Sequence, residues 1–95
     1  MSDKTQQLSQ FRYIQTQQRV CFSLYIVNQS KKFQTDQNLL FEEFQMKMPI
    51  EELQKIQKKQ FDQFQMYQKM EFVQFYMMQN AELEEFEEFQ KDQGN

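Results

Sequence analysis

The chain has 95 residues, of which 39% are hydrophobic and 16% aromatic, and its formal net charge is −3. This length suits one small domain, so residues 1–95 are expected to form a single helical domain. The charge disfavours nucleic acid as the main partner, because affinity for phosphate backbones comes mostly from clustered Lys and Arg. The acids are concentrated at the C-terminus, where residues 81–95 carry six acids and one Lys.

The composition also limits the chemistry. One Gly and one Pro predict an all-α chain with long helices. Without histidine, neither a Ser-His nor a Cys-His pair can form, and Gly94 alone cannot make a phosphate-binding loop. We therefore expect no enzyme, no cofactor and no metal site.

The location of the protein is constrained only broadly. Cys21 is the single cysteine, and the N-terminal residues contain no apolar signal-peptide core, so we expect an intracellular protein. The organellar, ciliary and nuclear compartments all stay open. No apolar run approaches the ~20 residues of a membrane-spanning helix, so the open alternative is peripheral association with a membrane complex.

Three helices are expected in chain order. The first occupies residues 1–34 and the second, a short one, residues 37–48, with Asp36 or Asn38 as its N-cap in the connection "QTDQ". Pro49 suits the first position of a third helix, residues 49–92, in which Glu51 and Glu52 favour the N-terminus. A break of this helix near Asn80 is an open alternative.

The third helix contains an eleven-residue repeat, seen when residues 50–93 are written in rows of eleven. Three columns are apolar: Ile50, Phe61, Phe72, Leu83; Leu53, Phe64, Phe75, Phe86; and Ile56, Tyr67, Met78, Phe89. Eleven residues are close to three helical turns, so these columns form one broad apolar stripe. Phe also recurs every eleven residues from Phe11 to Phe44.

Gln fills the eighth column of the repeat, at Gln57, Gln68, Gln79 and Gln90. Since Gln is the commonest residue and is spread through the whole chain, we interpret it as a compositional bias and assign it no function.

These patterns predict a helical hairpin or three-helix unit with a long C-terminal amphipathic helix of eleven-residue repeats. The first two helices are expected to cover two or three repeats and to leave the last one for a partner. The expected partner-binding residues are Leu83, Phe86, Phe89, Met78 and Phe75. The acids around them predict that the partner offers an apolar groove with a basic rim.

One resemblance to a known family is carried by aromatic and aliphatic spacings at Phe22, Tyr25, Phe33, Leu53, Phe61 and Phe72. They resemble those of the HMG box, a three-helix family, over about residues 20–78. The resemblance implies a nuclear protein. Because "QTQQRV" stands where the family has a basic N-terminal strand, the implied DNA binding is weak or absent.

The function expected from the sequence is that of a non-catalytic structural or accessory subunit, which docks by an amphipathic helix onto other proteins in a larger assembly. One alternative is the HMG-box-like nuclear protein. Another is an amphipathic helix that lies on a lipid surface, since eleven-residue repeats suit that role too.

Overall fold

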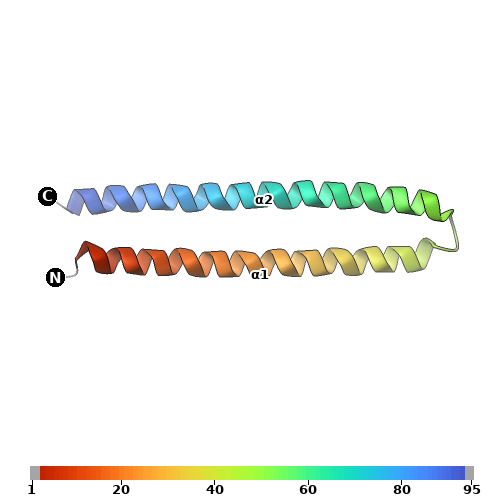
Figure 1. Cartoon of the computed structure of the whole chain (residues 1–95), viewed down its shortest axis with the longest axis horizontal. Coiled ribbons are helices and arrows are strands. Elements are labelled where there is room, and N and C mark those ends of the chain that lie inside the picture. The colour runs from red at the N-terminus through yellow and green to blue at the C-terminus, as the bar shows by residue number, and fades with distance from the viewer. Residues whose placement is uncertain (1–2, 94–95) are drawn as a thin grey trace. The chain divides into compact units, whose positions relative to one another are not determined.

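The computed structural model describes residues 3–93, which form two α-helices joined by residues 45–49 (Figure 1). Helix α1 is Lys4–Phe44, with 41 residues, and helix α2 is Ile50–Gln93, with 44 residues. The predicted all-α chain with a long C-terminal helix is confirmed. Of the two arrangements left open, the helical hairpin fits the structure and the three-helix unit does not.

The connection predicted at residues 35–36 is wrong, because α1 continues through it. Thr35 Oγ1 donates a hydrogen bond to the carbonyl of Lys31 at 3.0 Å, and Gln34 Nε2 donates to Asn38 Oδ1 at 3.0 Å. Polar side chains that often cap a helix thus bond within it, and no Gly or Pro stops it. The helices predicted at 1–34 and 37–48 are therefore one helix. The described residues form two helices and not the three that the HMG-box resemblance implies.

Asp3 marks the start of α1, and Pro49, as expected, marks that of α2. At the start of α1, the Gln6 amide donates to Asp3 Oδ1 at 2.9 Å, which is an N-cap. Pro49 directly precedes α2, and its carbonyl accepts from the amides of Glu52 and Leu53, both at 3.1 Å. Helix α2 then runs through Asn80 without interruption, so the alternative of a break there is wrong.

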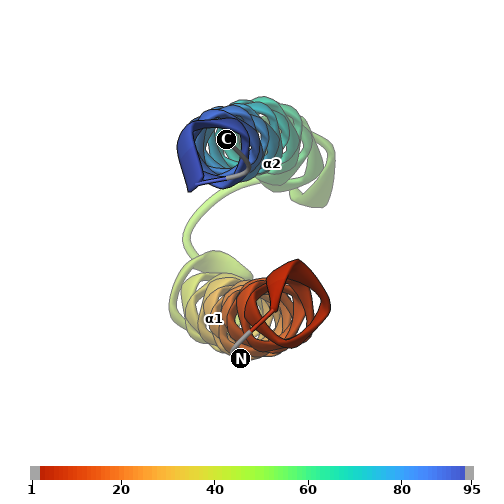
Figure 2. The same ribbon diagram turned by 90° about the vertical axis from the view of Figure 1, so that its left-hand side faces the viewer.

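The chain divides into two compact units, each of which contains a piece of both helices. Unit 1 comprises residues 3–23 and 71–93, and unit 2 comprises residues 24–70. Within each unit the two helix segments lie side by side and antiparallel, as Figures 1 and 2 show. Each unit therefore has one seam, along which its two segments face each other.

The core is narrow because each helix segment has only one neighbour in its unit. Among the described hydrophobic residues only Leu53 is buried, with 1% of its surface exposed. The remaining hydrophobic side chains are half-buried or exposed. Such a seam leaves much of each helix surface available for other contacts.

Candidate partner-binding surface

Stacked phenylalanine pairs join the two helix segments of each unit. In unit 1 the ring of Phe11 stacks on Phe86 and that of Phe22 on Phe75, with centroids 4.3 and 4.2 Å apart. In unit 2 Phe33 stacks on Phe64 at 4.2 Å. Along each helix these residues are eleven apart. The Phe recurrence in α1 thus supplies the side chains that face the second apolar column of α2.

Glutamine side chains make hydrogen bonds across the same seams. In unit 1 Gln15 and Gln79 form a reciprocal pair, in which each Nε2 donates to the other residue's carbonyl, at 2.9 and 3.0 Å. Further along unit 1, Gln90 Nε2 donates to the Lys4 carbonyl at 2.9 Å. Gln15 and Gln79 are also the only buried polar residues in the described part of the chain, with 8% and 7% exposed.

Unit 2 repeats this use of glutamine. Gln57 Nε2 donates to the carbonyl of Gln37, and Gln68 Nε2 donates to Ser30 Oγ, both at 2.9 Å. All four glutamines of the eighth column therefore bond across a seam. The compositional interpretation missed this structural role, which is possible because a Gln amide is long enough to reach the facing helix. Each such bond contributes about 1 kcal/mol net.

The third apolar column lies outside the seam. Its members Ile56, Tyr67, Met78 and Phe89 are all exposed, between 42% and 54%. The broad stripe predicted from the sequence is therefore too wide: Ile50, Phe61 and Phe72 of the first column are exposed as well, and Gln lies beside the second column in the seam. A single facing helix covers a narrower arc than a full core does.

The five predicted partner-binding residues divide into two groups. Phe75 and Phe86 are half-buried in the stacked pairs, and Leu83 is also half-buried. The expectation that the last repeat has no cover within the chain is wrong for Phe86, because the continuous α1 reaches it with Phe11. Met78 and Phe89 remain exposed, at 43% and 48%. Only these two are well placed to meet a partner directly.

One side of unit 1 is marked by a cavity between its helix segments. Leu8 and Leu83, which lie three residues before Phe11 and Phe86, both line this cavity. A side chain three residues before another on the same helix lies about 60° from it around the helix axis, always in the same sense. Because the segments are antiparallel, the same sense on both helices leads to the same side of the seam. We call this the Leu8 side.

The opposite side of unit 1 carries exposed apolar residues. Ile14 and Phe89 come three residues after the members of the Phe11–Phe86 stack, and Met78 comes three residues after Phe75. These positions lie about 60° in the other sense around each helix. All three side chains are exposed. We call this the Ile14 side; on α2 its sequence signal was the third apolar column, of which Met78 and Phe89 were predicted to bind a partner.

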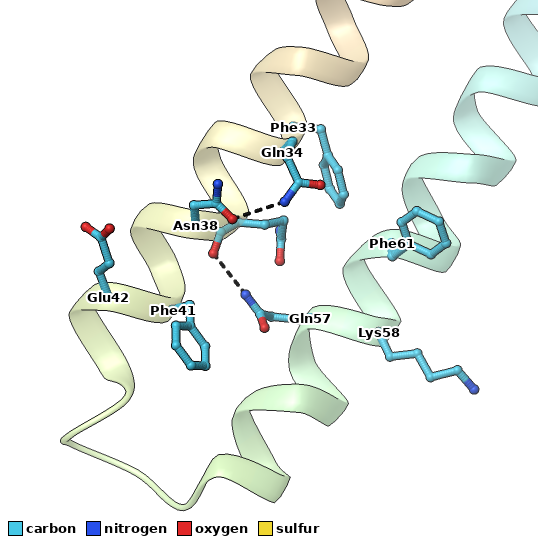
Figure 3. Close-up of a pocket in the computed structure, with 9 residues that line it drawn as sticks. Phe33, Gln34, Asn38, Phe41, Glu42, Gln57, Lys58 and Phe61 are labelled. Carbon is cyan, nitrogen blue, oxygen red and sulfur yellow. Dashed lines mark hydrogen bonds between the residues drawn. The ribbon is translucent and has the colours of Figure 1, made fainter.

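Unit 2 has a groove of about 600 Å³, shown in Figure 3. Its lining includes the aromatic rings of Phe33, Phe41 and Phe61 and the polar side chains of Gln57 and Lys58. The Gln57 amide crosses the seam beside it, as the dashed line in Figure 3 indicates. The lining thus mixes aromatic rings with amide and charged side chains.

The described residues show neither a metal site nor a membrane span. Residues 3–93 hold no group of three or more His, Cys, Asp or Glu that would bind a metal ion. Within the same range, neither helix combines the length and the hydrophobicity that crossing a membrane requires.

Comparisons with known proteins identify no relative. Neither the protein-family models, nor the curated proteins, nor the solved structures contain a match to this chain.

Proposed function

We propose that the protein is a non-catalytic accessory subunit, which docks on other proteins of a larger assembly through the apolar surface outside its seams. The observation that carries this proposal is exposure: twenty-one large hydrophobic side chains in the described chain are exposed, against one that is buried. Large exposed apolar surfaces mark interaction sites in soluble proteins.

The kinds of exposed side chain support the same proposal. Aromatic residues and Met predominate on α2, for example Tyr67, Met70, Met77 and Phe89. Aromatic side chains and Met are enriched at protein interfaces, and Met adapts its shape to irregular partners. The proposal assigns no reaction to the chain, because its sequence lacks histidine and the glycine-rich loops that common chemistries use.

We further propose that the eleven-residue spacing is the repeat of an antiparallel coiled coil. Stacked rings and glutamine bonds alternate along each seam. Eleven residues per three turns keep such a seam nearly straight. Within each unit, such a seam would leave a regular docking surface beside it.

The proposed function is tested by affinity purification with quantitative mass spectrometry. Phe89→Glu and Tyr67→Glu each place a charge on an exposed apolar site, one in each unit. We expect each variant to reduce the co-purifying subunits by about tenfold or more, as the loss of a central apolar contact does. Helicity should be unchanged, since neither ring belongs to a seam stack.

The control for this test is Gln65→Glu, which adds the same charge at an exposed polar site of α2. It should retain every subunit. If Phe89→Glu and Tyr67→Glu retain the same proteins in the same amounts as Gln65→Glu, the exposed apolar residues do not dock and the proposed function is wrong.

A further inference from the structure

The charges of unit 1 are divided between its two sides. On the Leu8 side, Arg12 and Arg19 line the cavity together with Glu87. Lys91 comes five residues after Phe86 and, at about 100° per residue, projects toward the same side. The remaining cation, Lys4, lies near the seam, where its carbonyl accepts from Gln90.

The Ile14 side carries acids. Glu82 and Glu85 lie four and one residues before Phe86, and Asp92 lies six residues after it. At about 100° per residue these three positions fall between 40° and 120° around the helix on the Ile14 side. In the described part of unit 1, no Lys or Arg projects to that side. Its exposed apolar residues therefore stand in a purely acidic setting.

We propose that the Ile14 side of unit 1 binds an amphipathic helix of another protein, whose apolar residues are flanked by Lys or Arg. This inference rests on the proposed function, because it names the surface and the chemistry of one docking partner. The acids complement the cations of such a helix, and complementary charge across an interface selects the partner and its orientation. Helix-in-groove contacts are a common mode of peptide recognition.

The apolar residues of this side have the spacing that a helix requires. Met78 and Phe89 are eleven residues apart, which is about 16 Å along α2 at 1.5 Å per residue. Since Phe11 faces Phe86, Ile14 lies between them along the seam, on the opposite segment. A partner helix laid along the seam would meet all three side chains with about three of its own turns.

A second copy of the chain fits this side less well. In a two-fold symmetric dimer the Ile14 sides of both copies would meet, with the same carboxylates at Glu82, Glu85 and Asp92 on each and no cation to face them. Like charges brought together across an interface oppose binding. A partner with the opposite charge avoids this repulsion.

The test uses the full chain and two synthetic helical peptides with the same Leu stripe, one flanked by Lys and the other by Glu. Fluorescence anisotropy measures the affinity of each. We expect the Lys-flanked peptide to bind about tenfold tighter or better at low salt, and the difference to shrink as salt screens the charges. Equal binding of the two peptides would overturn the charge assignment.

Matched variants locate the binding site. Met78→Lys places a charge on the Ile14 side, whereas Met77→Lys places the same charge on the back of α2, at a residue that is also exposed. We expect Met78→Lys to weaken the Lys-flanked peptide by about tenfold and Met77→Lys by about twofold at most. Circular dichroism should show the same helicity for both variants.

A second matched pair separates local attraction from net charge. Glu85→Lys removes an acid of the Ile14 side, and Glu84→Lys makes the same change one residue earlier, on the back of the helix. We expect the loss of affinity to be about fivefold larger for Glu85→Lys. Equal effects within both matched pairs would mean that only net charge attracts the peptide, and the inference would be wrong.

Two further outcomes are informative. If sedimentation shows a dimer of the wild-type chain that Met78→Lys dissociates, a second copy occupies this side and the inference is overturned. If Phe89→Glu and Tyr67→Glu lose the natural subunits but the Lys-flanked peptide does not bind, the proposed function stands and this inference alone fails.

Discussion

Leu53→Ala is expected to lower the free energy of unfolding by about 3 kcal/mol, within the range measured for buried Leu. Leu53 is the only hydrophobic side chain in the described chain that is buried, with 1% exposed. The narrow seam gives the cavity few neighbours that can fill it. Urea titration followed by circular dichroism at 222 nm measures the change.

The matched control is Ile56→Ala, one turn further along the same helix. The substitution Ile56→Ala removes a similar side-chain volume, but the Ile56 side chain is 42% exposed. It should cost about 0.5 kcal/mol, as an exposed substitution does. If Leu53→Ala and Ile56→Ala cost the same, the second apolar column is not the one that faces α1, and the seam described above is wrong.

Gln79→Glu is expected to destabilise the chain by about 3 kcal/mol at pH 7, a value typical of a buried charge left without a partner. The Gln79 amide donates to the Gln15 carbonyl at 3.0 Å, and it is 93% buried, since 7% is exposed. A carboxylate at this place has the same shape but cannot donate, so two oxygens would face each other. Urea titration measures the loss.

The loss should depend on pH. Burial raises the pKa of the introduced carboxyl group above the value near 4.3 that it has in the unfolded chain. The native state then binds a proton more tightly than the unfolded state, so the stability lost relative to the wild type is smallest below about pH 4 and grows as the pH rises. In its protonated form the carboxyl group can again donate to the Gln15 carbonyl.

Gln74→Glu provides the comparison, because Gln74 is an exposed residue of the same helix. This variant shows how much of the pH dependence of the unfolding free energy comes from the other carboxylates, which titrate in every variant. The difference between Gln79→Glu and Gln74→Glu should be smallest at acidic pH and largest at pH 7. A difference that is small and the same at all pH values would show that the Gln79 side chain is solvated.

Several features of the fold could be predicted from the sequence because they depend on local chemistry. Pro49 and the acids after it fix the start of α2, and the scarcity of Gly predicts long helices. The Phe recurrence in α1 was visible as well. The partners of these Phe residues could not be predicted, because only the pairing of Phe11 with Phe86 shows that α1 reaches the last repeat.

Other features depended on tertiary contacts that the sequence does not display. Thr35 and Asp36 have the composition of a connection, and only bonds within the helix keep α1 continuous there. Gln79 has the same side chain as exposed glutamines, and its role depends on the backbone that faces it. The residues of the candidate site changed for the same reason. Phe75 packs against Phe22 within the chain, whereas Met78 is exposed.

The most direct test of the account is the reactivity of Cys21 inside the native assembly. Cys21 is exposed and comes one residue before Phe22, so it lies on the Ile14 side of unit 1. A partner bound to that side should slow maleimide labelling of the thiol by about tenfold or more, because thiol reactions require access. The rate is compared between the high-mass fraction of a native extract and the purified chain.

The control is the double variant Cys21→Ser with Ser23→Cys, which moves the thiol to the Leu8 side. Its labelling rate should be similar in the extract and in the purified chain. A partner on the Ile14 side should protect a thiol at position 21 and give little protection at position 23. Equal labelling of Cys21 in the assembly and in the purified chain would contradict it.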